Sequence, residues 1–213
     1  PEDDAARVMA ALPRDVDRVV YGSTTGVFRI PDDPAVWVDE DWPAGPRGRR
    51  GRARLAYEQA LMATSPGPVH TVRIAGIYGP GRTLAPKLER GELVLFEGGP
   101  VTSRIHRDDL ARLLAAMVLD PAPPPRVVAT DEAPAPTLEV ARFTAELMGL
   151  PLPPVLSLDE ASKRLSPAAL ELRMGGKRCR SLHRASLMGS LRYPSYREGV
   201  RAALREEGKL APG

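Results

Sequence analysis

Residues 69–82 read Val69-His70-Thr71-Val72-Arg73-Ile74-Ala75-Gly76-Ile77-Tyr78-Gly79-Pro80-Gly81-Arg82, and this stretch decides the fold. Its first seven residues are rich in β-branched side chains, which favours a strand, and the Gly/Pro cluster after them favours a turn. Arg18–Tyr21 followed by Gly22–Gly26 repeats this strand-to-turn pattern, and Arg126–Ala129 is predicted to be a further strand. Helical segments of about 10–15 residues alternate with these strands, which predicts a parallel α/β sheet.

The helices are predicted from the spacing of their apolar residues. In the helix over 49–63, Leu55, Gln59 and Met62 are predicted to face inward. Residues 29–48 are rich in Pro, Gly and Asp and are expected to form a long loop. The other helices are expected over 3–12, 84–90, 108–119 and 137–148, with a strand over 101–105.

The C-terminal part of the chain carries several helix-start signals. Ser157-x-x-Glu160 and Ser195-x-x-Glu198 are capping boxes, and Ser166-Pro167 is an N-cap followed by proline at the first helical position. Residues 151–213 are therefore expected to be mostly short helices, forming a small lobe beside the sheet.

Bulk composition is that of a globular protein. Of the 213 residues, 43% are hydrophobic and 27% charged, so a sizeable core in one domain is expected. No apolar run approaches the roughly 18 residues that a membrane helix needs. The acidic start, Pro1–Asp4, does not resemble a signal peptide, so we expect a cytoplasmic protein with no membrane partner.

The single cysteine, Cys179, excludes an intrachain disulfide. Its neighbours Lys177, Arg178 and Arg180 could lower its pKa, although an unreactive thiol is the simpler interpretation. The chain has no second Cys, so we expect no metal site.

Positive charge is concentrated locally. The net charge is only +3, but Pro46–Arg54 contains five arginines. This patch could be an anion site, a solvated surface, or a segment that binds a polyanion. Aromatic residues are only 5% of the chain, and without a stacking platform a nucleic-acid partner is disfavoured.

The order of local motifs resembles the extended short-chain dehydrogenases/reductases of the NAD-dependent epimerase/dehydratase family. The turn in Tyr21-Gly22-Ser23-Thr24-Thr25-Gly26-Val27-Phe28 is similar to the family's Ser/Thr-rich strand end, with Thr24 at the position of the catalytic Ser/Thr. Leu55-Ala56-Tyr57-Glu58-Gln59 resembles the continuation of the family's Tyr-x-x-x-Lys, but Arg50 and Arg54 stand at the Tyr and Lys positions.

Three later segments continue the resemblance in the family's order. Arg73–Gly81 is similar to Arg-x-x-x-(Val/Ile)-Tyr-Gly-Pro-Gly. Ser103–Ala111 resembles the stretch that introduces the substrate-domain helix, and Asp131–Pro134 the turn after a late strand. Together the matches span most of residues 17–150.

This resemblance implies a partial Rossmann-like parallel sheet with a small, mostly helical C-terminal substrate lobe. Residues 1–150 would form the C-terminal part of an NAD(P)-binding domain interleaved with substrate-lobe segments, and residues 151–213 the helical lobe. The cofactor would be NAD or NADP and the partner a small or sugar-like substrate, with a homodimer left open. The family's Gly-rich binding turn does not follow any strand here, so we expect that start to be missing from this chain.

The resemblance also implies site residues. In the family a phenol exchanges a proton with the substrate, a role that a guanidinium cannot readily fill because it keeps its proton near neutral pH. We therefore expect an oxidoreductase or epimerase-like protein with impaired activity, or alternatively a non-catalytic sensor or scaffold. The candidates are catalytic Thr24, Arg50 and Arg54; cofactor-binding Gly22, Ser23, Arg54, Ala75, Gly76 and Ile77; and substrate-binding Tyr78, Arg82 and Arg104. His106, Asp108 and Asp109 are expected mainly to stabilise the start of the helix that follows.

Overall fold

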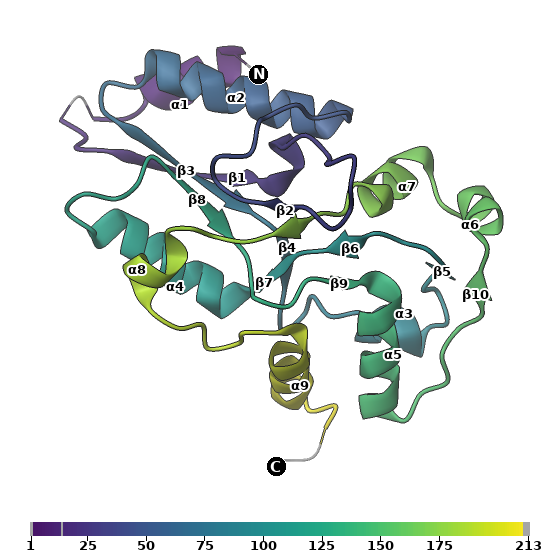
Figure 1. The fold of residues 1–213 in the computed structure, drawn as a ribbon. Helices are drawn as coiled ribbons and strands as arrows, with labels where there is room; N and C mark the ends of the chain where they lie inside the picture. The colour runs from purple at the N-terminus through teal and green to yellow at the C-terminus, as the bar shows by residue number, and fades with distance from the viewer. Residues whose placement is uncertain (1, 14, 211–213) are drawn as a thin grey trace.

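The computed structural model describes residues 2–13 and 15–210 of the chain (Figure 1). Its centre is a parallel sheet of β1 (Val19–Thr24), β3 (Val69–Ile74) and β8 (Arg126–Ala129), in the order β1-β3-β8. This confirms the predicted α/β class and partial parallel sheet. Because the strands are parallel, their carboxyl ends meet at one edge, where ligands bind in open α/β sheets.

β1 is longer than the sequence predicts. Gly22, Ser23 and Thr24 were expected in a turn but continue the strand, pairing with Val72, Arg73 and Ile74 of β3. The prediction was wrong because cross-strand pairing overrides the low strand preference of such residues. The turn begins three residues later than predicted, with a short 3₁₀ helix, η1 (Thr25–Val27).

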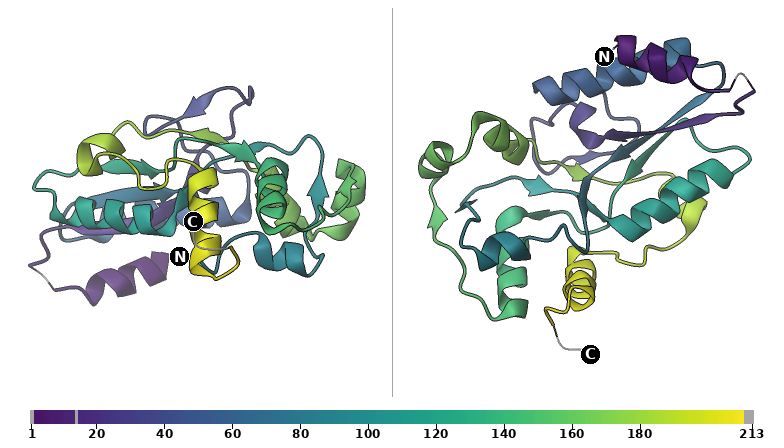
Figure 2. Two further views of the ribbon diagram at one scale, coloured as in Figure 1. Left: turned by 90° about the horizontal axis from the view of Figure 1, so that it is seen from below. Right: turned by 180° about the vertical axis from the view of Figure 1, so that it is seen from behind.

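Helices cover both faces of the sheet. α1 (Glu2–Ala10) and α2 (Arg49–Thr64) lie on one face, and α4 (Arg107–Leu119) and α8 (Arg184–Met188) lie on the other (Figures 1 and 2). Alternate β1 residues point to opposite faces, so Val19 packs in the cluster under α1 and α2 while Val20 packs with α4.

The inward face of α2 differs from the predicted one. Glu58 and Leu61 are buried, whereas Gln59 is exposed and Met62 is 46% exposed. One residue corresponds to about 100° around a helix, so the prediction was wrong by roughly one position. The physical reason is Arg73 of β3, whose guanidinium binds the Glu58 carboxylate and turns that residue toward the sheet.

Short strand pairs surround the carboxyl edge of the sheet. Ser103 interrupts the predicted strand over 101–105, and the long loop over 29–48 contains a two-residue strand. The pairs are β4 (Gly76–Tyr78) with β7 (Arg104–His106), β6 (Val101–Thr102) with β9 (Ala135–Pro136), β5 (Leu95–Phe96) with β10 (Val155–Leu156), and β2 (Trp37–Val38) with β11 (Arg178–Cys179).

The remaining helices begin and end where the local signals predict. Ser157 and Ser195 both form capping boxes, Ser166 caps its helix, and Gly149 ends another with φ of 63°. These helices are α3 (Ala85–Glu89), α5 (Thr137–Met148), α6 (Leu158–Arg164), α7 (Pro167–Met174) and α9 (Tyr196–Glu206).

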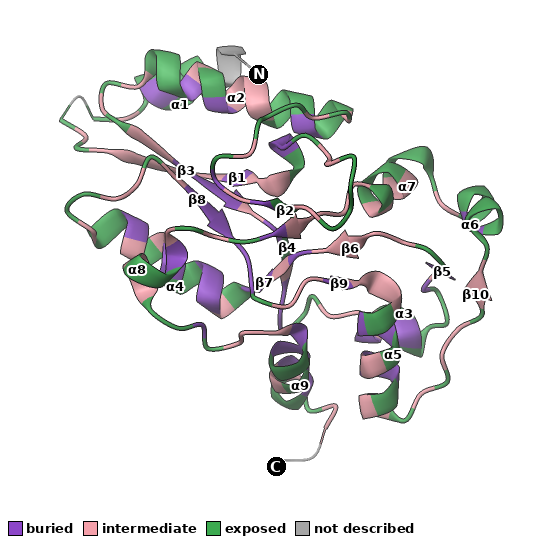
Figure 3. Ribbon diagram, viewed as in Figure 1, coloured by how far each residue is buried: buried purple, intermediate pink, exposed green. Residues whose placement is uncertain are grey.

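Burial is uneven between these elements. Buried residues gather in the sheet and in the helix faces that cover it, whereas α6 and α7 are largely exposed (Figure 3). α7 contains no buried residue. Within residues 2–13 and 15–210, no helix combines the length and apolar character required to cross a membrane.

Candidate functional site

A cavity of about 660 Å³ lies at the carboxyl ends of β1 and β3. Segments far apart in sequence form its wall: the end of β1 with η1, the β3–β4 junction, the loop into α3, the β6–β7 junction, the start of α5, the α7–β11 segment and one residue of α9. The lining residues include Thr24, Ala75, Gly76, Ile77, Tyr78, Arg82, Lys87, Ser103, Arg104, Arg173, Gly176, Lys177 and Cys179.

The charged residues that line this cavity are all positively charged. Five cations line it, namely Arg82, Lys87, Arg104, Arg173 and Lys177, and no Asp or Glu of the described chain does so. A concave site lined by cations concentrates anions and holds them through charge-assisted hydrogen bonds. The cavity therefore has the chemistry of a site for an anionic ligand.

Thr24 supplies a hydroxyl at one end of the cavity. The pairing of Thr24 with Ile74 at the end of the ladder places it at the carboxyl edge. Its Oγ1 accepts a hydrogen bond from the Gly26 backbone N–H at 3.1 Å and caps η1. Because an accepted bond leaves the hydroxyl proton unused, Thr24 can still donate to a ligand oxygen.

Arg104 is held in the wall by backbone carbonyls. Its Nη1 donates to Thr102 O at 2.7 Å and to Ala135 O at 2.8 Å, and no carboxylate of the described chain lies within ion-pair distance. Burial lowers the pKa of Arg104, and nearby Asp131 offsets part of that effect. A desolvated guanidinium without an ion-pair partner is well suited to bind an anion.

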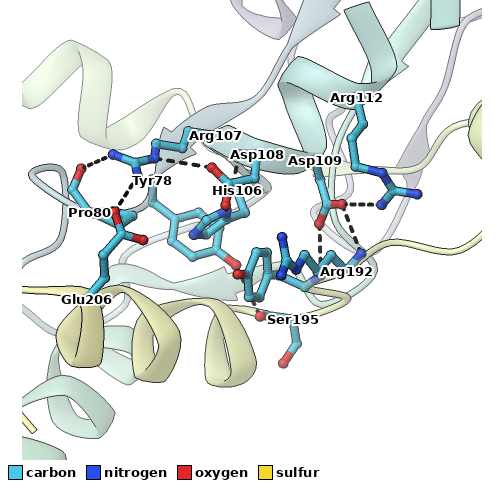
Figure 4. Close-up of polar contacts among 11 residues, drawn as sticks. Tyr78, Pro80, His106, Arg107, Asp108, Asp109, Arg112, Arg192, Ser195 and Glu206 are labelled. Carbon is cyan, nitrogen blue, oxygen red and sulfur yellow. Dashed lines mark hydrogen bonds and ion pairs between the residues drawn. The ribbon is translucent and has the colours of Figure 1, made fainter. Parts of the chain in front are cut away.

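Tyr78 lines the cavity, but its phenol is engaged elsewhere. The hydroxyl donates to the Ser195 carbonyl at 3.1 Å, and the ring meets His106 edge-on (Figure 4). Burial raises the pKa of Tyr78 far above its ordinary value. Tyr78 can therefore shape the wall but is a poor donor or acceptor of protons near neutral pH.

The remaining predicted residues divide between the wall and its surroundings. Arg82, Ala75, Gly76 and Ile77 line the cavity, which brings all three predicted substrate contacts and half of the predicted cofactor contacts together with Thr24. Gly22 and Ser23 lie just behind, in β1. The Ser23 hydroxyl is buried and has no hydrogen-bond partner within the described chain.

Arg50 and Arg54 lie on α2 and do not line the cavity. Both are exposed, and Arg54 donates to the Tyr21 hydroxyl at 2.7 Å. Tyr57, a phenol on the same helix, packs against Tyr21 with ring centroids 5.3 Å apart and also stays outside the cavity. In the described part of the chain, this helix thus contributes no side chain to the wall.

Sequence reasoning missed several lining residues. Three of them, Arg173, Lys177 and Lys87, stand outside the matched family motifs. Ser103 stands inside one of these motifs but was not predicted to be a site residue. The Gly175-Gly176 pair between Arg173 and Lys177 was a usable signal, because glycines often mark close approach of a backbone. The basic neighbours of Cys179 do not lower its pKa, because burial raises the pKa of the thiol to about 11, which agrees with the simpler interpretation of an unreactive thiol.

His106 has the capping role expected for it. Its Nδ1 accepts from the Asp108 N–H at 3.2 Å, and its ring stacks on Tyr193 with centroids 3.9 Å apart. Asp109 is fully buried and accepts from the backbone N–H groups of Arg192 and Tyr193 (Figure 4). The carboxylate predicted only to favour the helix start therefore also fastens the C-terminal segment to α4.

Two solved structures with a similar fold share more than a quarter of their aligned residues with this chain. A conserved protein of unknown function from Silicibacter pomeroyi is 38% identical, with a TM-score of 0.81 over 96% of this chain and 70% of that one. A protein from Methylobacillus flagellatus, assigned as an NAD-dependent epimerase/dehydratase, is 26% identical, with a TM-score of 0.65 over 91% and 65%. The chain belongs to the NAD-dependent epimerase/dehydratase family.

More distant solved structures share the fold. MoeE5 is 22% identical, with a TM-score of 0.72 over 96% of this chain and 70% of that chain, and was solved with UDP-glucose and NAD. No family model and no curated protein sequence matches the chain. Membership in the epimerase/dehydratase family therefore rests on three-dimensional similarity together with the ordered motifs.

Proposed function

We propose that this chain forms the substrate-binding part of an NAD(P)-dependent oxidoreductase of the epimerase/dehydratase type, acting on an anionic, sugar-like substrate. The observation that carries the proposal is the cavity, which combines Thr24 at the end of β1 with five cations and, in the described residues, no carboxylate. Sugar nucleotides have both features that such a site would recognise, hydroxyls and phosphates. MoeE5, with UDP-glucose and NAD bound, supports this choice.

Four residues of the cavity then have assigned tasks. Thr24 donates its hydroxyl proton to the substrate oxygen at the reacting carbon, where charge develops. Arg104 and Arg82 bind the anionic part of the substrate and orient it. Tyr78 closes the wall and helps to exclude water.

The cofactor side of the site is partly present in this chain. The Ser23 hydroxyl is buried and unpartnered in the described chain, so it is a polar group that a nicotinamide riboside could use, and Ala75, Gly76 and Ile77 line the cavity in front of it. When bound, the nicotinamide ring would supply the hydride donor or acceptor.

An alternative is a non-catalytic relative that binds cofactor or metabolite as a sensor or scaffold. The observation that favours it is the absence, among the described lining residues, of a free phenol or carboxylate for proton exchange. Arg50 and Arg54 stand where the family has that phenol and its ammonium. The same ligands would bind under this alternative, but turnover would not follow.

Cofactor titration and turnover assays separate these possibilities. The chain, and a form extended by any upstream coding sequence, are titrated with NADH and NADPH by fluorescence and assayed with UDP-glucose. Turnover that falls about 100-fold in Thr24→Val supports the enzyme. Binding without turnover, with turnover gained in Arg50→Tyr/Arg54→Lys, supports the non-catalytic alternative. No binding in either form at millimolar cofactor contradicts both.

A polyanion-binding role for the Arg47–Arg54 patch is tested separately. The patch lies at the start of α2 and contributes no residue to the cavity lining. Binding to RNA that does not weaken with added salt would exclude backbone recognition by these arginines.

A further inference from the structure

Few groups in the cavity wall can exchange a proton near neutral pH. None of the described lining residues is His, Asp or Glu. The arginines keep their protons, and an alcohol such as Thr24 releases its proton too reluctantly to act alone. Burial raises the pKa of the Tyr78 phenol, which is also bound to a backbone carbonyl, and raises the pKa of the Cys179 thiol to about 11. The amines of Lys87 and Lys177 remain.

The two lysines differ in how well their charge is compensated. Lys87 lies on α3 and is exposed, so water solvates its ammonium group. Lys177 is partly buried just before β11, and its Nζ donates to the Gly175 carbonyl at 3.0 Å. Within the described residues, the lysine ion pairs are those of Lys163 and Lys209, and no carboxylate lies within ion-pair distance of Lys177. Lys177 has therefore lost water without gaining an opposite charge.

The surroundings of Lys177 favour its neutral amine. Four other cations line the same cavity: Arg82 before α3, Lys87 on α3, Arg104 on β7 and Arg173 on α7. Burial lowers the pKa of Lys177, and Cys179 of β11 opposes this effect only in part. A desolvated lysine of this kind can both take up and release a proton, which a guanidinium cannot do.

The backbone of Lys177 is held beside the end of the central sheet. Its carbonyl accepts from the Ser103 N–H at 3.2 Å and from the Ser103 hydroxyl at 3.1 Å. The Ser103 carbonyl accepts from the Gly76 N–H at 3.1 Å, so a single residue joins Lys177 to the β3–β4 junction. That junction belongs to the cavity wall that also contains Thr24.

Gly176 makes this placement possible. A methyl group at its Cα would lie 2.5 Å from the Val101 carbonyl oxygen and 2.9 Å from Thr102 Oγ1. The backbone therefore passes β6 at a distance that only glycine permits, and Lys177 enters the wall directly after it. The position of Lys177 is thus fixed on both sides, by Gly176 and by Ser103.

We propose that Lys177 is the catalytic acid/base of this site and exchanges a proton with the substrate hydroxyl that is oxidised. It takes over the task of the phenol that the family places on α2, where this chain has Arg50. A cavity of about 660 Å³ is of the size that encloses a small ligand, so Thr24 and Lys177 can contact one bound substrate. The role rests on the proposed function, which it deepens.

The proton and electron balance of the step is complete. In the oxidising direction, the neutral Lys177 amine takes the hydroxyl proton, and the O–H electron pair becomes the second C–O bond. The hydrogen on the same carbon leaves with its electron pair, as hydride, to NAD(P)⁺. In the reducing direction, the Lys177 ammonium returns its proton to the carbonyl oxygen while the carbon receives hydride.

Competitive labelling with acetic anhydride, followed by mass spectrometry, tests the amine without any turnover. Only an unprotonated amine reacts, so the labelling of each lysine in a pH series follows its own ionisation. Lys177 should reach half-maximal labelling at a lower pH than Lys163, which is exposed on α6 and pairs with Asp159. UDP-glucose should protect Lys177 from the label and leave Lys163 unprotected, since Lys163 does not line the cavity.

Turnover of UDP-glucose, in the chain and in its extended form, tests the chemistry. Lys177→Met should lower turnover about 100-fold, the lower end of what acid–base catalysis contributes. Lys177→Arg should lose turnover as well but retain binding of UDP-glucose, because arginine keeps the charge and does not release its proton. Lys163→Met is the matched control and should leave turnover unchanged.

The pH profile provides a readout that a purely structural lysine would not change. For oxidation, kcat/KM should rise with pH through the midpoint found by labelling Lys177, because only the neutral amine can accept a proton. The residual turnover of Lys177→Met should lack this rise, whereas Lys163→Met should keep it.

Three outcomes would overturn the role of Lys177 alone: full turnover in Lys177→Arg, a labelling midpoint equal to that of Lys163, or an unchanged pH profile in Lys177→Met. If Lys177→Met does not fold, Lys177→Arg and the labelling decide the question. Absence of turnover in the unsubstituted protein, with UDP-glucose bound, would instead remove the proposed enzyme and the role of Lys177 with it.

Discussion

The Arg73 and Glu58 side chains are each 2% exposed and form an ion pair of 2.8 Å between β3 and α2. The Arg73 guanidinium also lies over the Phe28 ring, 4.6 Å from its centroid. This pair is the centre of the scaffold behind the cavity, because it sets the rotation of α2 and packs against the residue after η1. A buried charge that loses its partner is strongly destabilising.

Glu58→Gln is therefore expected to reduce the free energy of unfolding by about 3–5 kcal/mol, because it leaves Arg73 buried and uncompensated. Urea unfolding followed by circular dichroism measures the change. Glu92→Gln is the matched control, since its pair with Arg90 is more than half exposed and should contribute about 1 kcal/mol or less. Similar losses in the two variants would contradict the role given to the buried pair.

His106 is predicted to make stability depend on pH. Burial lowers its pKa, an effect that outweighs the attraction of Asp108 and Asp109, while Arg107 acts in the same direction as burial. The unfolded chain thus takes up the proton more readily, so the contribution is present above pH about 6.5 and is lost as pH falls below it.

His106→Asn, which can still cap the helix, should flatten this dependence between pH 7.5 and 5.5. Urea midpoints of the two proteins across that range measure it. The comparison between proteins is essential because burial raises the pKa of Asp131 to about 7, and that group titrates in the same window with the opposite sign. An unchanged slope in His106→Asn would assign the dependence to other groups.

At the scale of elements, the fit of α9 against β4 shapes the cavity. Gly199 of α9 lies against the Tyr78 ring, and a methyl group there would overlap the phenol oxygen. The capping box of Ser195 and Glu198 fixes where α9 begins, and the Ser195 carbonyl accepts from Tyr78. The residue that caps the start of α9 therefore also holds Tyr78 in the cavity wall.

Gly199→Ala is expected to lower stability by about 1–3 kcal/mol through overpacking, although alanine favours helices by up to about 1 kcal/mol. Because Tyr78 must move, binding of UDP-glucose in the cavity should weaken as well. Arg205→Ala on the exposed side of α9 is the control and should change neither quantity. If Gly199→Ala were more stable than the unsubstituted protein, the Tyr78 ring could move aside without a loss of free energy, which would contradict this prediction.

At the scale of the whole molecule, the two outer strands of the central sheet differ. At the outer edge of β8, the Val128 N–H donates a hydrogen bond to the buried Glu40 carboxylate at 2.8 Å. The same carboxylate also accepts from the Leu182 N–H. β1 pairs only with β3 in the described residues, so its other edge has no ladder partner there. Open edges exchange protons with water and can pair with another chain.

Hydrogen exchange followed by mass spectrometry should therefore show faster exchange in a peptide covering 19–24 than in peptides covering 69–74 or 126–129. The difference should persist on dilution if the chain is monomeric. Equal protection of all three, lost on dilution, would indicate that a second copy covers the edge of β1.

The amino-acid sequence by itself determined the α/β class, the family motifs and most helix boundaries. Those features depend on short-range periodicity and on caps three residues apart, as at Ser157 and Glu160. Thr24, Tyr78, Arg82 and Arg104 were found because they stand at motif positions. Whether they carry the assigned roles stays a prediction.

Only the tertiary structure decided the rotation of α2, the enclosure of the cavity and its uniform charge. Glu58 faces inward because Arg73, fifteen residues away, binds it. Lys177 enters the wall because Ser103, 74 residues away, holds its backbone. Local periodicity contains no information about such pairings, since the contacts form only when distant segments pack, and packing decides which charges lose water and which keep it.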